Sequence, residues 1–128
     1  MEPIVNMHIM TNEVSLKSNG LTGENFQIKP RFTRDIKQLD DTHWAASLRV
    51  EIMNTEENPF PVEIIVDMTG LFDVSRLDKK DIQSFMKIQT LQLMLPHIRN
   101  IIANLTTAAL MNPLMLPIYD ARKLFPDE

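Results

Sequence analysis

Hydrophobic and polar side chains alternate with a period of two in three stretches of the first 75 residues: FQIKPRFTRDI (26–36), WAASLRVEI (44–52) and VEIIVDMTGLFDV (62–74). This alternation is typical of antiparallel strands with one buried and one solvated face. A fourth stretch, IVNMHIMTNEVSLK (4–17), changes parity near Thr11 or Asn12, which predicts a strand with a β-bulge there. Pro30 predicts that the 26–36 strand lies at a sheet edge or carries a bulge.

From Ser75 onward the hydrophobic spacing becomes helical. The stretch 82–95 is apolar on every side, so a single sheet covers only one of its flanks. Pro96 interrupts LQLMLPHIRNIIANLT, and we predict that a new helix begins there, because proline fits a first helical turn and disfavours helical geometry in the preceding residue. A proline-broken loop, LMNPLMLP, then leads to a short helix in YDARKLF that Pro126 is expected to end.

These patterns predict an α+β fold. We expect a four-stranded antiparallel sheet, arranged as a meander, followed by a long proline-interrupted helical region and a short C-terminal helix. The linkers SNGLTGEN and NTEENPFP hold the Gly, Pro and Asn residues that turns require, and their lengths favour pairing between strands that are neighbours in sequence. A length of 128 residues predicts one domain spanning 1–128.

Composition and charge exclude several classes of function. Without cysteine the chain has no disulfide framework, thiol nucleophile or thiolate zinc site, which fits a reducing cytoplasmic location. A net charge of −4, with thirteen scattered basic residues, argues against a nucleic-acid surface. The charge-free stretch 100–119 is long enough to span a membrane, but its amides and prolines would be badly solvated in hydrocarbon, so we expect no membrane insertion.

Residues that carry chemistry are sparse. His8, His43 and His97 lack the spacing of a metal site, and three glycines are too few for a phosphate-binding loop. We therefore expect no catalytic site, no metal and no cofactor. Among nine methionines, Met111 and Met115 lie in the proline-broken loop. These two either fill gaps in a core or provide the flexible apolar surface typical of binding many partners, and the sequence favours neither interpretation.

Five segments, in order along most of the chain, resemble the SecB family of protein-export chaperones. IMTNEVSLKSN is similar to the family's first strand, and WAASLRVEI and VDMTGLFDV are similar to two later strands. LQLMLPHIRNIIANL resembles the helix signature Asn-Ile-Leu-Phe-Pro-Tyr-Ala-Arg-Glu, with Pro96 and Arg99 on its Pro and Arg. PLMLPIYDARKLF resembles the closing motif Leu-x-Leu-x-Pro-x-x-Phe-x-x-Leu-Phe. Each motif alone is weak, and their shared order and spacing make the resemblance specific.

The resemblance implies a dimer of dimers with helices between sheets, which would cover the apolar 82–95 helix. We therefore expect an oligomer interface that contains Ile82, Phe85, Ile88, Leu91 and Leu95. It also implies a non-enzymatic, ATP-independent holdase that binds unfolded client polypeptides in apolar grooves. For the groove we predict residues of the second strand, the proline-broken loop and the last helix: Phe26, Ile28, Phe32, Met111, Leu114, Met115, Leu116, Tyr119, Leu124 and Phe125.

Departures from the family pattern concern the motor ATPase SecA, which SecB contacts through acids on the outer sheet face. Glu13 keeps one of these acids, whereas Lys17 and Ile65 stand at the other two positions, so we expect weak SecA binding. An alternative is a SecB-like chaperone dedicated to one client, such as an antitoxin. A second alternative is an adaptor or structural module of phage or defence-system origin on the same fold. An enzyme with a small apolar cavity is a third, which the lack of acid–base groups disfavours.

Overall fold

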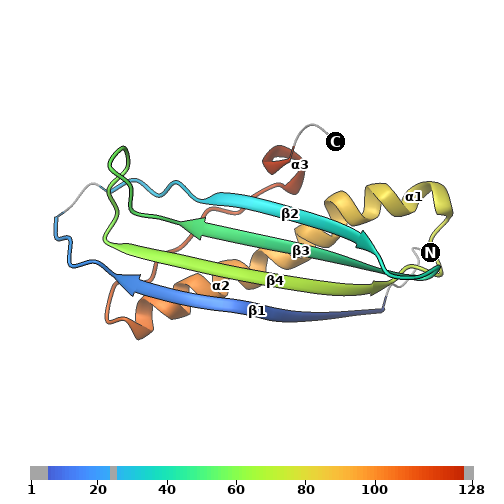
Figure 1. The fold of residues 1–128 in the computed structure, drawn as a ribbon, viewed down its shortest axis with the longest axis horizontal. Helices are drawn as coiled ribbons and strands as arrows, with labels where there is room; N and C mark the ends of the chain where they lie inside the picture. Colours follow the sequence, from blue (N-terminus) through green and yellow to red (C-terminus); the bar gives the residue numbers. More distant parts are fainter. Residues whose placement is uncertain (1–5, 24–25, 126–128) are drawn as a thin grey trace.

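The computed structural model describes residues 6–23 and 26–125. The elements are β1 (Asn6–Ser18), β2 (Arg31–Gln38), β3 (His43–Ile52), β4 (Val62–Asp73), α1 (Lys79–Ser84), the π-helical turn η1 (Phe85–Gln89), α2 (Thr90–Ala108) and α3 (Ala121–Leu124). The four strands form one antiparallel sheet, and the helical region crosses behind it as a second layer (Figure 1). This arrangement confirms the predicted α+β class. None of the described helices is long and apolar enough to cross a membrane.

The order of the strands corrects the predicted meander. β2, β3 and β4 pair in sequence, but β1 pairs with β4 at the opposite edge from β2, giving the order β1-β4-β3-β2. The chain after β1 is fixed to the β3–β4 turn: the main-chain N–H of Asn19 donates to the Pro61 oxygen at 3.1 Å, and its side chain donates to the Phe60 oxygen at 2.7 Å. Sequence reasoning missed this crossover because the linker is long enough to reach either neighbour.

The predicted bulge in β1 is confirmed. The register with β4 shifts between Thr11 and Glu13, so that Asn12 is the additional residue. Its amide nitrogen donates to Thr69 Oγ1 at 2.7 Å and to Asp67 Oδ1 at 3.1 Å on β4, which secures the bulge on the outer face. β2 is an edge strand that begins immediately after Pro30, later than the predicted start at Phe26.

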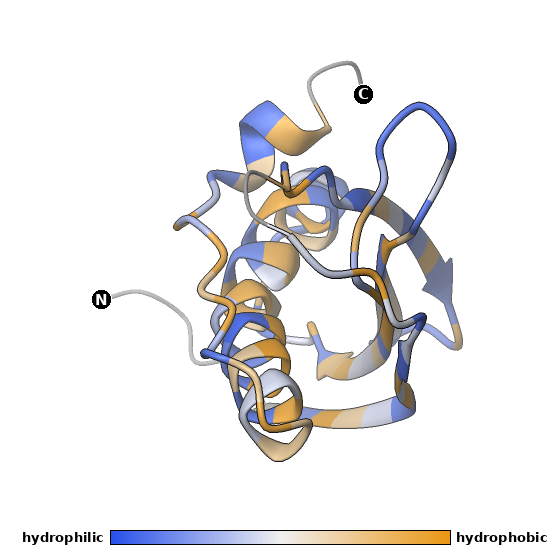
Figure 2. Ribbon diagram, turned by 90° about the vertical axis from the view of Figure 1, so that its left-hand side faces the viewer, coloured by the Kyte–Doolittle hydropathy of each residue, from blue (hydrophilic) through white to orange (hydrophobic). Residues whose placement is uncertain are grey.

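The core lies between the inner face of the sheet and α2 (Figure 2). Even-numbered side chains of β3 and β4 are buried, which is the face that the alternation predicted. Gly70 makes room for the Phe72 ring: a Cβ at this position would lie 2.6 Å from that ring, whereas its distance of 3.5 Å to the Met94 sulfur would be an ordinary contact. A larger residue at position 70 would therefore displace the Phe72 ring.

The helical region is continuous from Lys79 to Ala108, with Asp78 at its N-cap. Pro96 lies inside α2, so the predicted restart at this residue is wrong. Proline removes one helical hydrogen bond, but Leu95, Ile98 and Ile102 are buried against the sheet and hold both halves of the helix on the same surface. The last helix ends at Leu124, and Pro126, its expected stop, lies outside the described residues.

Candidate functional site

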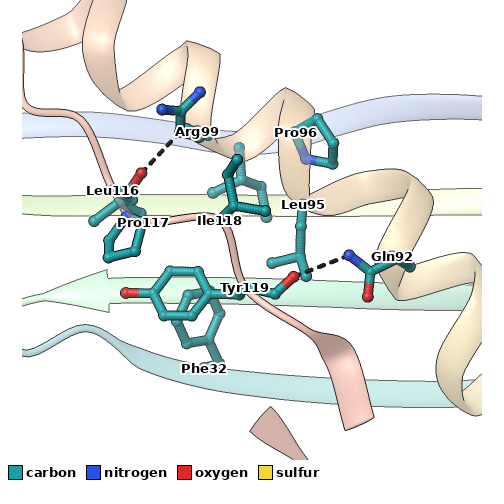
Figure 3. Close-up of a pocket in the computed structure, with 10 residues that line it drawn as sticks. Phe32, Gln92, Leu95, Pro96, Arg99, Leu116, Pro117, Ile118 and Tyr119 are labelled. Atoms are coloured by element: carbon teal, nitrogen blue, oxygen red, sulfur yellow. Dashed lines mark hydrogen bonds between the residues drawn. The ribbon is translucent and has the colours of Figure 1, made fainter. Parts of the chain in front are cut away.

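An apolar cavity of about 190 Å³ lies between α2 and the segment that leads into α3 (Figure 3). Its lining comes from β2, from α2 and from the segment after α2: Phe32, Gln92, Leu95, Pro96, Ile98, Arg99, Leu116, Pro117, Ile118 and Tyr119. An apolar cavity of about 150 Å³ accommodates a benzene molecule. The cavity therefore has room for one aromatic or branched aliphatic side chain.

Two polar side chains of α2 hold the segment over the cavity. Arg99 Nε donates to the Leu116 main-chain oxygen at 2.7 Å, and Gln92 Nε2 donates to the Tyr119 oxygen at 2.9 Å. Gln92 Oε1 also accepts from the N–H of Ala121 at 2.9 Å. Segment 113–120 has no regular secondary structure, so these bonds replace the partners that a helix or strand would have given its main chain.

Aromatic residues form the β2 side of the cavity. The Phe32 and Tyr119 rings meet edge to face, with centroids 5.1 Å apart. Burial raises the pKa of the Tyr119 phenol further above neutral pH, where the phenol is uncharged. Exposed apolar side chains border the cavity: the lining residue Ile118 is 85% exposed, and Met115, which precedes the lining residue Leu116 in sequence, is 50% exposed. Exposed apolar side chains around an apolar cavity mark a surface suited to binding another apolar group.

The predicted groove residues fall into three groups. Phe32, Leu116 and Tyr119 line the cavity, although Leu116 is itself buried in the core. Phe26 and Ile28 precede β2 and do not line the cavity, and Phe26 packs on Phe60 with ring centroids 6.0 Å apart. The remaining five belong to the C-terminal segment, where four are half-buried and one is exposed: Met111, Leu114, Met115, Leu124 and Phe125.

Sequence reasoning missed the contribution of α2. Gln92, Pro96 and Arg99 are spaced i, i+4 and i+7, which places them on one helix face, and all three line the cavity. This spacing could have identified the three residues as one surface. The apolar stripe of the same helix was interpreted only as a face of the core. The predicted helix break at Pro96 also separated residues that lie on one surface.

The predicted oligomer interface divides between the core and the surface. Leu91 is 0% exposed and Leu95 is 7% exposed, so both belong to the core of a single chain. Ile82, Phe85 and Ile88 are half-buried beside the core, and Phe85 packs edge to face on Phe72 with centroids 6.1 Å apart. Ile82 and Phe85 remain as interface proposals, whereas Ile88 lines a hollow between the helical region and α3.

Glu13, the proposed SecA contact, lies on the outer face of the sheet and is already paired. Arg49 contacts Glu13 and Asp67 at 3.0 Å each and Glu51 at 3.6 Å. One guanidinium thus serves three carboxylates from β1, β3 and β4. Within 6–23 and 26–125, no group of three or more His, Asp or Glu side chains is arranged to hold a metal ion.

Residues 7–128 match the family model described as preprotein translocase subunit SecB. No curated protein matches the chain. Among solved structures, the fold is similar to the Rv1957 SecB-like chaperone of Mycobacterium tuberculosis, in complex with a ChAD peptide from the Rv1956 HigA1 antitoxin. The TM-score is 0.73 at 13% identity, over 91% of each chain. A protein of unknown function from Streptococcus agalactiae has a TM-score of 0.50 at 12% identity, over 89% of this chain and 97% of that one. At these identities the two structures establish the fold alone.

Proposed function

Because the chain belongs to the SecB family of chaperones, we propose that it is an ATP-independent holdase. In this proposal unfolded or partly folded client polypeptides bind by placing apolar side chains in the cavity between α2 and segment 116–119. Burial of apolar surface is non-directional and contributes about 25 cal/mol per Å², so it tolerates many client sequences. No hydrolysis or cofactor is required for binding of this kind.

One observation carries the proposal: an apolar cavity with room for a single large side chain opens beside the exposed Ile118 and Met115. A soluble domain keeps such a surface at a cost, since exposed apolar groups favour aggregation. Binding of client side chains to this surface would explain why the apolar groups are exposed despite that cost. The solved complex of the SecB-like chaperone with an antitoxin peptide supports polypeptide binding by this fold.

Client affinity of matched variants tests the proposal. Ile118→Ser and Met115→Ser remove exposed apolar groups beside the cavity, whereas Leu39→Ser removes one that is 49% exposed at the β2–β3 turn. We expect the double variant to bind a reduced, unfolded client about tenfold more weakly and to suppress its aggregation poorly, with Leu39→Ser unchanged. Equal loss in both variants, or no loss in either, would overturn the proposed site.

Membership of the SecB family also suggests an assembly state and further partners. We propose a cytoplasmic homodimer or dimer of dimers. The client is either a set of exported proteins or one dedicated protein such as an antitoxin. Contact with SecA through Glu13 should be weak and lost at moderate salt, because Arg49 already neutralises that carboxylate. SecA affinity measured at low and moderate ionic strength checks this expectation, and tight salt-insensitive binding would contradict it.

A further inference from the structure

A cationic hollow lies between the start of the helical region and α3. It has a volume of about 570 Å³, and its lining includes Lys80 of α1, Lys87 of η1 and Arg122 of α3. The apolar side chains of Ile88 and Phe125 complete two of its walls. The hollow therefore presents three positive charges beside an apolar surface.

The cationic hollow and the apolar cavity border a common intermediate hollow. This hollow, of about 410 Å³, shares Ile88 and Arg122 with the cationic hollow, and it shares Gln92, Ile118 and Tyr119 with the cavity. The three spaces follow one another along the helical region, and together we call them the groove. An extended polypeptide in this groove would place one side chain in the cavity and later side chains near the cations.

In the part of the chain that the structure describes, no ion pair neutralises the positive charges of the hollow: the ion pairs involve His43 and Arg49, and none reaches Lys80, Lys87 or Arg122. None of the described residues that line the hollow is acidic, although the whole chain carries a net charge of −4. Asp120 lines the intermediate hollow, where its carboxylate caps α3 by accepting from the Arg122 N–H at 2.9 Å.

Arg34 fixes the position of two of these walls. Its guanidinium donates to the Lys87 main-chain oxygen at 2.9 Å and lies 4.7 Å from the centroid of the Phe125 ring. The carbonyl belongs to the π-helical turn η1, a feature found frequently at functional sites. The hollow is thus held open by contacts between β2, η1 and the residue after α3.

We propose that the cationic hollow binds acidic residues of a client segment whose apolar anchor occupies the cavity. This inference rests on the proposed function and defines a client class: an extended segment with one large apolar residue followed or preceded by Asp or Glu. Complementary charge raises association rates and selects partners more than it raises affinity. Three exposed charge pairs, each contributing a factor of about two, together predict roughly a tenfold preference.

Three unstructured peptides test this preference. Each carries the same central Trp, and the flanking residues are Glu, Gln or Lys. By fluorescence anisotropy we expect the Glu peptide to bind about tenfold more tightly than the Gln peptide at low salt, with the Lys peptide weakest. The difference should shrink toward zero at about 0.5 M salt, where the screening length is a few ångströms. Equal affinity of the Glu and Gln peptides would overturn the inference.

Two variants of equal charge change locate the effect. One replaces Lys80, Lys87 and Arg122 with Gln, and the control replaces Lys17, Lys29 and Lys37, which are exposed outside the groove. Only the first should lose the Glu preference, while both retain their thermal unfolding temperature and their affinity for the Gln peptide. Equal loss in both variants would indicate a general charge effect and contradict the cationic hollow.

Failure of this inference is distinguishable from failure of the proposed function. If the Gln peptide binds and Ile118→Ser lowers its affinity, client binding at the cavity is supported, whether or not the flanking charges change the affinity. If none of the peptides binds, both proposals are wrong. Single-stranded DNA or polyglutamate that binds as tightly as the Glu peptide, with the same dependence on Lys80, Lys87 and Arg122, would identify a general polyanion site and overturn the client class.

Discussion

Leu116 and Ile118 lie two residues apart on the same segment but differ in burial, being 2% and 85% exposed. Leu116→Ala should lower the free energy of unfolding by about 2–4 kcal/mol, because it leaves a void in the core. Ile118→Ser should change that free energy by less than about 0.5 kcal/mol while weakening client binding. Urea unfolding of the two variants checks the contrast. Equal stability of both would show that the segment does not pack as described.

Asp40 in the β2–β3 turn makes stability depend on pH. Its Oδ1 accepts from the N–H groups of Thr42 at 2.9 Å and His43 at 2.8 Å. The Thr42 hydrogen bond is the main cause that lowers the pKa of Asp40 from 3.8 to about 2. The carboxylate therefore stabilises the fold above pH 4, and this contribution is lost as pH falls through about 2.

Asp40→Asn should flatten the dependence of stability on pH between 4 and 2 and lower stability at pH 7. Denaturant unfolding at several pH values measures both effects. An unchanged slope in this variant would assign the acid sensitivity to other carboxylates. Asp67→Asn is a suitable comparison, because Asp67 pairs with Arg49 elsewhere on the sheet.

At the scale of elements, the end of α2 is strained at one residue. The N–H of Met111 donates to the Thr106 oxygen and that of Leu110 to the Thr107 oxygen, both at 3.0 Å, which is the Schellman pattern. That pattern requires positive φ at Leu110, where φ is 62° and the side chain is 95% exposed. Glycine adopts this conformation without the steric cost that leucine meets.

Leu110→Gly should therefore raise the free energy of unfolding by roughly 0.5–1 kcal/mol, partly offset by greater freedom of the unfolded chain. The thermal unfolding temperature measures this gain, with Ala109→Gly as a control that should lose stability. A decrease in Leu110→Gly would show that the exposed leucine side chain has a packing role, for example in an oligomer.

Most elements could be predicted from the sequence because each strand has one buried and one wet face, and period-two alternation records that difference directly. The bulge at Asn12 changed the parity and was visible for the same reason. The position of β1 could not be predicted, since alternation specifies a face but not a neighbour. Pro96 misled the prediction because local proline sterics are outweighed here by packing of α2 on the sheet. The α2 side of the cavity was missed for that reason.

At the scale of the whole molecule, β1 is an edge strand with exposed apolar side chains. Met7 and Val14 of β1 pair with Phe72 and Val66, which are buried on the inner face of β4, yet they are 51% and 43% exposed. Within the described residues, one side of the β1 main chain has no strand partner. An edge strand with exposed apolar residues favours association with another chain.

We expect an assembly of two or four chains. Light scattering at micromolar concentration should give that mass, and Val14→Lys should reduce it because like charges and lost apolar burial oppose edge pairing. A monomeric mass for the wild type would contradict this expectation. Leu91→Glu should unfold the chain and not merely split the assembly, since it places an unpaired charge in the core.

The central claim is that clients bind at the cavity between α2 and segment 116–119. Its most direct test is photo-crosslinking of a labelled unfolded client to a benzophenone side chain at position 118, compared with position 37 on the outer face of β2. Binding at the cavity predicts crosslinks at position 118 that unlabelled client removes, and a weak background at position 37. Crosslinks of equal or greater yield at 37, or none at 118 from a folded variant, would contradict it.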